Sequence, residues 1–556
     1  MPPVLPPASA QLISVPGISA PHVLGQWLKD PIGVERFNCK GDFNGSTGFD
    51  NQKTLAEAIG SGEKLVFAPG KAYLTGVPLV ATNRALGMEG TYGASAIVMP
   101  AGVPGMVVSQ DTYSHATNIR NLNFLTLGTE TAQKSALTVQ YAVDDSGNFR
   151  NHERCSLEGI VVGGVDYLQH GWDVGIDTID VHNLSLRYPF IRGRRNFADY
   201  GGGRLSFATM TAGIRNTGTS ESSRPSDALV ERPYVFNAKT AIQSRGEVEG
   251  FAVENPILVA VLVGFDIQNS SARPWGSISG GHISALDVMI SAKNCPSFMA
   301  RDILFYKGAP AGVMPAGMYP TDIVPGPAGT VVVYLEACPG FDLSGLKAIN
   351  NAADYASGGA HIGVVLKDCL AGDIREFRHN KPTVSVYEIG TSGGNITSNL
   401  RTQGTYTGSP VAEYVDRSTG GGNERTDGNR PVGTVTNAAP ITVGTTPDQT
   451  VLVFVPMAQV GQRYRVDVQV EAGLTTAGEV NFSLSNAGGS ASGAWAASAG
   501  YVPDRGQSAA GTRGSTMSGT YTVSARGSLA LRLSLQMLSG AATVGAGKAQ
   551  MTVTLL

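Results

Sequence analysis

The 556-residue chain carries little charge and has no long apolar run. Only 15% of its residues are charged and the formal net charge is −3, so composition offers no concentrated basic surface for nucleic acid or anionic lipid. The longest apolar stretch, Ile257 to Phe265, is about half of the roughly 18 residues that a membrane span needs. The N-terminal MPPVLPPASAQLISVPG lacks a basic start followed by an apolar segment. We therefore expect no nucleic-acid partner, no membrane insertion and no secretion through a cleaved signal.

Cysteine is also scarce. The five cysteines are odd in number, widely spaced and free of any CxxC or Cys/His cluster of the zinc type. Cysteines of this kind are commonly buried as free thiols, and a protein assembled in a reducing cytosol fits them. We expect no metal and no cofactor. The five are Cys39, Cys155, Cys295, Cys338 and Cys369.

Glycine, proline and strand-forming residues are abundant. The chain has 71 Gly and 30 Pro, alongside many Val, Ile, Thr, Ser and Asn, which suits short strands joined by tight turns. A chain of this length exceeds one ordinary core, so an elongated repeat structure or several domains must accommodate it. The composition predicts an all-β protein.

A repeat runs from about residue 90 to 400. Its form is apolar, any residue, Asn/Gly/Asp, apolar, any residue, apolar, and the spacing of several copies is a small multiple of about 20 residues. A fixed period of strand-like segments with loops inserted into some turns is typical of a parallel β-helix. The copies are IRNLNF at 119, LEGIVV at 157, VHNLSL at 181, VERPYV at 230, VEGFAV at 248, ARDILF at 300 and LKDCLA at 366.

The segments that flank the repeat suggest a cap, a linker and a second β domain. Residues 1–34 are Pro-rich and suit an attachment or capping segment. Residues 35–90 suit the N-terminal cap of a parallel β-helix that spans residues 91–400. Residues 401–430 are rich in Gly, Thr, Ser and Asn and indicate a linker or cap. Alternating strands such as TVLVFVPM and RYRVDVQVEAG at 431–556 predict a β-sandwich.

The cap carries a family resemblance. Gly33 to Gly76 contains a Gly/Asp/Asn-rich turn, a short helix at Asn51 to Ile59, a buried strand, and then Pro69-Gly70 and Tyr73. This order resembles the N-terminal cap of the pectate-lyase-like β-helix superfamily, although Gly70 falls one place early in the "v-x-x-P-x-G-x-Y" strand. A small helix there would close the open end of the solenoid.

Cap, repeat and C-terminal domain together resemble bacteriophage tailspikes and capsular polysaccharide depolymerases. The resemblance implies a right-handed parallel β-helix with a small N-terminal cap and a C-terminal β-sandwich, the latter for trimerisation or carbohydrate binding. It further implies a homotrimer attached to the phage tail or baseplate through its N-terminus. Such a virion protein, assembled in the host cytoplasm, would bind and depolymerise a surface polysaccharide at the bacterial cell surface.

The repeat predicts an outward column of charged residues. If the copies stack in register, the second position of each points outward, because strand side chains alternate. This column has acidic residues in its middle and basic residues at its ends. Its members are Arg120, Glu158, His182, Glu231, Glu249, Arg301 and Lys367.

The middle of this column is the candidate active site. Glycoside hydrolysis needs two carboxyl groups, one to protonate the leaving oxygen and one to activate water or attack. Directly stacked Glu231 and Glu249 would suit retention, and the wider diagonal pair Glu231 and Glu247 would suit inversion. The candidate catalytic residues are Glu231, Glu249, Glu247, Asp227 and Asp180, and His182 and Arg245 are candidates to bind substrate.

Two other functions remain open. A polysaccharide lyase would need a base and a cation beside a uronate, which Arg245, His182 and Lys367 could supply, as could Arg195 and Tyr200 in the loop IRGRRNFADYGGGR. A non-catalytic receptor-binding fibre would grip the same polymer without cutting it. For each function, Trp172 and Trp275 in Gly- or Pro-flanked turns are candidates to stack against sugar rings.

Overall fold

The computed structural model describes residues 31–425, apart from 111–114, 142–154, 196–208, 222–224, 271–272, 308–311, 322–323, 325, 351–358, 404–411 and 422. It also describes the paired strands β1 (Leu12–Ile13) and β2 (His22–Val23) and the strands between 430 and 555. The chain divides into two compact units. One holds residues 1–396 and 401–424, and the other holds 397–400 and 425–556.

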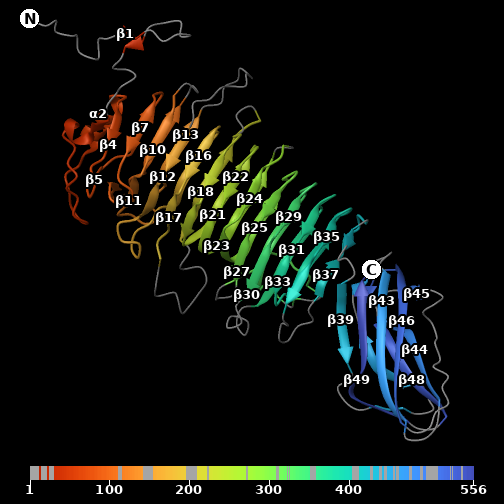
Figure 1. The fold of residues 1–556 in the computed structure, drawn as a ribbon. Helices are drawn as coiled ribbons and strands as arrows, with labels where there is room; N and C mark the ends of the chain where they lie inside the picture. Colours follow the sequence, from red (N-terminus) through yellow and green to blue (C-terminus); the bar gives the residue numbers. More distant parts are fainter. Residues whose placement is uncertain are drawn as a thin grey trace, which may run out of the picture. The chain divides into compact units, whose positions relative to one another are not determined.

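The first unit is a parallel β-helix whose coils contribute strands to three faces (Figure 1). The predicted all-β fold with a parallel β-helix is therefore confirmed. Face 1 is a 14-stranded sheet, and faces 2 and 3 together form a 22-stranded sheet because β23 and β25 extend across both. Stacked strands are paired in register, so each outward position forms a column that runs along the solenoid.

Face 1 consists of β3 (Ile32–Gly33), β4 (Lys64–Val66), β7 (Leu86–Glu89), β10 (Thr117–Arg120), β13 (Cys155–Glu158), β16 (Leu184–Arg187), β19 (Leu229–Glu231), β22 (Ala252–Glu254), β24 (Ser277–Ser279), β26 (Met299–Arg301), β29 (Asp342–Ser344), β32 (Asp373–Arg375), β35 (Ile396–Ser398) and β38 (Glu424–Arg425). Face 2 consists of β5 (Ala72–Leu74), β8 (Ala96–Met99), β11 (Asn123–Thr126), β14 (Val161–Gly164), β17 (Phe190–Arg192), β20 (Tyr234–Phe236), the first part of β23 (Ile257–Asn269) and of β25 (His282–Lys293), β27 (Leu304–Lys307), β30 (Lys347–Asn350), β33 (Arg378–Asn380) and β36 (Arg401–Gln403). Face 3 consists of β6 (Leu79–Thr82), β9 (Met106–Gln110), β12 (Ser135–Tyr141), β15 (Val174–Ile179), β18 (Met210–Gly218), β21 (Ala238–Gly246), the later parts of β23 and β25, β28 (Gly329–Glu336), β31 (Ala360–Lys367), β34 (Val384–Ile389) and β37 (Ala412–Asp416).

The core consists of stacked apolar side chains inside the coils. On the three-residue strands of face 1 the central residue is buried, as with Val230 and Val253, while its neighbours point outward. Each buried side chain thereby packs on its equivalent one coil above and below. Continuous burial of this kind stabilises the solenoid.

The corners depend on residues in the left-handed backbone conformation. At the corner between faces 1 and 2, Asn121, Gly159 and Asn255 have φ of 54°, 61° and 49°. The corner N–H donates to a carbonyl of the next coil, as from Asn121 to Glu158 at 2.8 Å and from Asn255 to Ser279 at 2.7 Å. Asn and Gly recur here because they tolerate this conformation best.

A short helix covers the first coils. It is α2 (Gln52–Gly60), preceded by the 3₁₀ helix η2 (Val34–Phe37), and it buries Leu55, Ala58 and Ile59 against the solenoid. The predicted N-terminal cap is therefore present. The five cysteines are buried free thiols, as predicted. Among the described residues, no helix has the length and apolarity to cross a membrane.

The second unit contains two main antiparallel sheets. In the larger sheet, alternate residues of β43, such as Val466 and Val468, are buried, which marks one face as a core. The larger sheet comprises β39 (Arg430–Thr436), β40 (Ile441–Val443), β43 (Arg463–Leu474), β45 (Ser492–Trp495), β46 (Gly511–Ala525) and β49 (Ala542–Leu555). The smaller comprises β41 (Asp448–Phe454), β44 (Glu479–Gly488) and β48 (Ala530–Ser539), and β42 (Met457–Ala458) pairs with β47 (Gly527–Ser528).

A buried carboxyl group lies in the last coils of the β-helix. Glu388 on β34 is fully buried and accepts hydrogen bonds from Tyr414 Oη at 2.5 Å and Asn395 Nδ2 at 2.9 Å. Burial raises its pKa from 4.5 to about 7, and the nearby Asp416 adds to this effect, while the two hydrogen bonds oppose it. The folded protein therefore holds this proton to a higher pH than the unfolded chain does.

We predict that Glu388 makes the β-helix less stable as pH rises. Its stabilising contribution is complete below about pH 4.5 and is lost as pH rises through about 7, on the order of 3 kcal/mol in all. Glu388→Gln, which mimics the protonated group, should therefore be more stable than the wild type at pH 8 but not at pH 4.5. Urea unfolding at both values tests this, with the exposed Glu376→Gln as control. Equal pH dependence in the wild type and Glu388→Gln would contradict it.

Candidate functional site

The structure corrects the predicted pairing of Glu231. On face 1, Glu231 lies in register with Glu254 on the following strand, not with Glu249. Of the predicted column, only Arg120, Glu158, Glu231 and Arg301 share one line along face 1, where Arg187 takes the place expected for His182. Lys367 stacks against Glu336 on face 3. The predicted stack of Glu231 on Glu249 is wrong.

The error has a physical cause, because different corners of a coil share one local sequence pattern. Gly159 and Arg232 turn between faces 1 and 2, Asn183 and Gly250 precede face 1, and Asp368 follows face 3. All five have φ between 48° and 68°. Each corner needs a residue that tolerates this conformation beside buried apolar neighbours. The motif therefore predicted a corner without saying which one.

The remaining predicted carboxylates lie at a different corner from Glu231. Asp227 and Glu249 precede β19 and β22, and Glu247 directly follows β21. Asp227 and Glu231 are four residues apart, about 13 Å along an extended strand. Glu231 therefore does not join Asp180, Asp227, Glu247 and Glu249 in one patch.

The other polar candidates of that group form contacts within the solenoid. The buried Asp180 carboxylate accepts hydrogen bonds from Thr219 N at 2.8 Å and Thr219 Oγ1 at 2.6 Å. His182 Nδ1 lies 3.1 Å from Ser226 Oγ. Arg245 Nη2 donates to Asp266 Oδ2 at 2.8 Å on face 3. Asp180 thus links successive coils at a left-handed turn residue.

The tryptophan prediction is also wrong. Trp172 and Trp275 are both 0% exposed, so neither presents a ring face to a ligand. Trp172 Nε1 donates to Phe124 O at 3.2 Å, and Trp275 Nε1 donates to Ser244 Oγ at 2.9 Å. Both rings fill the core with their polar atom satisfied.

The arginine-rich loop is described only in part. Arg195 N donates to Tyr167 O at 2.8 Å, whereas Tyr200 lies outside the described residues. Arg194 forms a two-point ion pair with Glu130, with Nη2 to Oε1 at 2.6 Å. Among the described residues, no group of three or more His, Cys, Asp or Glu side chains could hold a metal ion.

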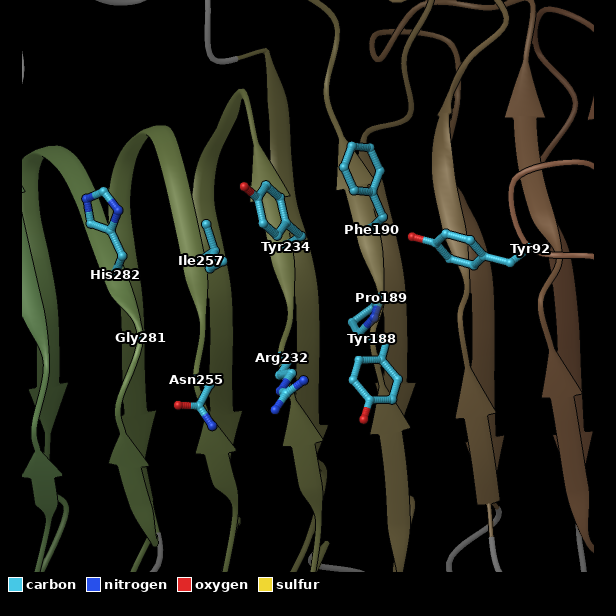
Figure 2. A pocket seen from close by; sticks show the side chains of 10 residues that line it. All are labelled: Tyr92, Tyr188, Pro189, Phe190, Arg232, Tyr234, Asn255, Ile257, Gly281 and His282. Atoms are coloured by element: carbon cyan, nitrogen blue, oxygen red, sulfur yellow. The ribbon is translucent and has the colours of Figure 1, made fainter.

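An open pocket of about 520 Å³ lies along the corner between faces 1 and 2 (Figure 2). The side chains that line it are mainly aromatic and apolar, with a few polar groups among them, which is the usual character of a ligand site. Apart from Tyr92, which belongs to an earlier coil, they come from four successive coils, so the pocket is elongated along the solenoid. Its lining consists of Tyr92, Tyr188, Pro189, Phe190, Arg232, Tyr234, Asn255, Ile257, Gly281 and His282.

The wall on face 2 is a ladder of partly exposed aromatic rings. Phe190 and Tyr234 occupy equivalent outward positions on β17 and β20, and their rings stack at 5.7 Å with planes 15° apart. Phe236, two residues after Tyr234, packs 4.7 Å from the Tyr234 ring. Aromatic rings on an outward surface provide flat apolar faces on which a ligand ring can stack.

Two carboxylates stand beside this pocket at the end of face 1. Tyr188 Oη donates to Glu231 Oε1 at 3.4 Å, and Arg187 Nε lies 3.5 Å from Glu231 Oε2. Both of these residues belong to the preceding coil, on the side away from Glu254. Glu254 is exposed, and no ion pair of its carboxylate occurs among the described residues. The pocket edge therefore has two carboxylates on successive strands, of which Glu231 contacts the preceding coil and Glu254 is exposed.

His282 supplies a neutral polar group at the other end of the pocket. Burial lowers the pKa of its imidazole below 6.5, which keeps the ring uncharged near neutral pH. Its ring meets Tyr306 edge-on at 6.0 Å. Its Nε2 is buried without a hydrogen-bond partner in the described part of the chain.

Two large side chains at this corner adopt a conformation that costs free energy. Tyr188 and Arg232 have φ of 53° and 48°, where the equivalent corner residues Gly159 and Asn255 fit without penalty. Both are exposed, and the Arg232 guanidinium lies 5.8 Å from the centre of the Tyr188 ring. Strained residues of this kind cluster at functional sites, where their side chains have a use that offsets the strain.

A recurring proline would have given the correct register from sequence. The segments RYPFI, ERPYV and ENPIL place Pro189, Pro233 and Pro256 directly after the corner residue. Aligning these three prolines puts Glu231 opposite Glu254 and puts Phe190 opposite Tyr234. The aromatic residues at 190, 234 and 236 also alternate with buried aliphatic residues, which marks them as outward positions.

Among the comparisons with known proteins, only the search of solved structures gave matches. No protein-family model matches the chain, and neither does any curated relative. Among solved structures, an Acinetobacter phage vB_ApiP_P1 tailspike protein matches at 13% identity and TM-score 0.35, over 94% of this chain and 91% of that one. A tailspike mutant of Escherichia coli bacteriophage HK620, in complex with a hexasaccharide, matches at 10% identity and TM-score 0.39, over 96% of this chain and 98% of that one. The catalytic unit of a GH87 alpha-1,3-glucanase from Streptomyces thermodiastaticus matches at 11% identity and TM-score 0.36, over 71% of this chain and 68% of that one.

We predict that relieving the strain at Arg232 stabilises the protein. Arg232→Asn should raise the free energy of unfolding by about 1 kcal/mol, because Asn adopts the left-handed conformation more readily. Urea unfolding measures the difference. Arg120→Asn on the extended strand β10 is the control and should give no gain. A loss of stability in Arg232→Asn would show that the corner is not strained.

Proposed function

We propose that this chain is a phage tailspike that binds a bacterial surface polysaccharide in the pocket between faces 1 and 2 and hydrolyses it. The observation that carries the proposal is the juxtaposition of a partly exposed aromatic ladder with two carboxylates on successive strands. Sugar rings stack on flat apolar surfaces, and glycoside hydrolysis requires a pair of carboxyl groups. The cap and the stacked coils that resemble tailspikes support the biological setting, in which a homotrimer attached to the tail acts at the cell surface.

Glu231 is suited to activate water or to attack the sugar. Arg187 and Tyr188 contact its carboxylate from the preceding coil and would help to orient it, which a base or a nucleophile needs. Glu254, which is exposed beside it, would protonate the leaving oxygen. Because adjacent strands lie about 4.8 Å apart and the partners of Glu231 lie on the far side from Glu254, the two carboxyl groups can flank one glycosidic bond.

The remaining pocket residues would hold the polymer. Phe190 and Tyr234 would stack on successive sugar rings, and Arg232 and His282 would bond to ring substituents. Because these residues come from several coils, a chain molecule lying along the solenoid reaches all of them at once. This geometry suits cleavage inside a polymer.

We predict that Glu231→Gln and Glu254→Gln each lower cleavage by about a hundredfold or more, the usual effect of removing a general acid or base. The assay is release of reducing ends from capsule, exopolysaccharide or lipopolysaccharide of a host bacterium. Glu249→Gln is the matched control and should cut at nearly the wild-type rate, because Glu249 lies at another corner of the coil.

The same assay separates the competing functions. Polymer that is bound but never shortened by the wild type would identify a non-catalytic receptor-binding fibre. New ultraviolet absorbance from an unsaturated uronate would identify a lyase. Near-normal cleavage by both Glu231→Gln and Glu254→Gln would remove this pair from the mechanism.

The aromatic ladder gives a separate prediction for binding. Tyr234→Ala should weaken binding of the polysaccharide roughly tenfold, the loss expected when an aromatic anchor is truncated. Affinity is measured with polysaccharide fragments on the Glu254→Gln background, so that cleavage does not interfere. Phe49→Ala, which removes an exposed aromatic ring of the cap, serves as the control. Equal losses in the two variants would contradict a role for the ladder.

A further inference from the structure

The outward column that begins with the aromatic ladder ends in three stacked cations. From Phe190 the column passes through Tyr234, Ile257, His282 and Leu304 on successive strands of face 2. It then reaches Lys347, Arg378 and Arg401, which lie in register on β30, β33 and β36. All three cations are exposed. We call these three residues the cationic ladder.

This ladder differs from two other charged groups on the solenoid, in each of which one carboxylate forms ion pairs with cations from neighbouring coils. On face 3, Glu336 lies between Lys293 and Lys367 and pairs with both, at 2.9 and 2.6 Å. On face 1, Asp342 pairs with both Arg301 and Arg375 at 2.6 Å.

The cationic ladder lacks such a counter-charge. In the described part of the chain, Lys347, Arg378 and Arg401 form no ion pair. The nearby Glu376, at the corner two residues before Arg378, forms none either. Like charges stacked directly on adjacent strands destabilise a sheet. Three of them in succession are therefore a cost to the fold that an external anion would offset.

We infer that the cationic ladder binds acidic groups of the same polysaccharide, so that the substrate is an anionic polymer. The inference rests on the proposed function and names the class of its substrate. A polymer lying along the column would meet aromatic rings at one end and three cations at the other. Seven strand spacings of about 4.8 Å separate Phe190 from Arg401, roughly 34 Å in all. Carboxylate or phosphate substituents of the sugars would each serve, because both accept charge-assisted hydrogen bonds from Lys and Arg.

The position of the ladder favours a glycan over another anion. The cations continue the column whose earlier members line the pocket, so one extended molecule can use both. The cations are also spaced along a straight line, as repeating acidic groups on a stiff polymer are. A compact anion would contact only part of this ladder.

The test compares charge-matched variants of the full chain. The ladder variant is Lys347→Gln/Arg378→Gln/Arg401→Gln. The control is Lys64→Gln/Lys293→Gln/Lys367→Gln, which removes the same charge from cations that pair with Glu89 or Glu336 on other faces. The probes are polygalacturonate, the same polymer after reduction of its carboxyl groups, and phosphate-bearing teichoic acid. Affinity is measured by calorimetry at low and at physiological salt.

We expect the wild type and the control to bind at least one acidic polymer more tightly than the reduced polymer. We expect the ladder variant to bind that acidic polymer about tenfold more weakly, from three exposed ion pairs of modest strength each. The difference should shrink as salt rises, because exposed charges are screened. Loss with polygalacturonate assigns carboxylate, and loss with teichoic acid assigns phosphate.

Equal affinity of the ladder variant and the control for both acidic polymers would overturn the inference. So would dissociation of oligomers in the ladder variant alone, measured by light scattering, because the cations would then contact another copy of the chain. Neither outcome affects the proposed hydrolysis, which is tested by release of reducing ends from host polysaccharide. Conversely, ladder-dependent binding without cleavage would sustain this inference and reject the hydrolytic proposal.

Discussion

The hydrogen bond from each corner N–H to the next coil fixes the register on which the rest of the structure depends. At the corner between faces 1 and 2, the backbone N–H of Tyr188 donates to Glu231 O at 2.9 Å. The backbone N–H of Arg232 likewise donates to Glu254 O at 2.7 Å. With the register fixed, inward side chains stack into a continuous core and outward side chains become columns. A one-residue slip would exchange the two sets. The aromatic ladder and the pair Glu231 and Glu254 therefore exist only because the corners are regular.

The corner that fixes the register also departs from the usual residue choice at the pocket. Asn or Gly would satisfy the backbone there, yet Tyr188 and Arg232 occupy two successive coils at positive φ. Tyr188 donates to Glu231 and Arg232 lines the pocket, so both large side chains lie where a ligand would contact them. The strained backbone at these two residues costs free energy. Burial of apolar side chains along the solenoid offsets that cost.

The architecture was predictable from composition and the repeat motif, whereas the pairing of site residues was not predictable from that motif. Composition, the cap at Asn51 and the turn motif indicated a parallel β-helix, because each depends only on local physics. The pairing of Glu231 depends on which corner each motif occupies, and Gly159 and Gly250 look alike locally while turning different corners. The burial of Trp172 and Trp275 likewise depends on neighbouring coils. The recurring prolines Pro189, Pro233 and Pro256 are the sequence feature that predicts the correct pairing of the strands.

The location of a bound glycan tests the account most directly. A crystal structure of Glu254→Gln with oligosaccharides released from host polysaccharide by the wild-type protein would show it. We predict sugar rings on Phe190 and Tyr234, with a glycosidic linkage between positions 231 and 254. Sugar bound instead at the corner of Asp227 and Glu249, with the pocket between faces 1 and 2 empty, would contradict it.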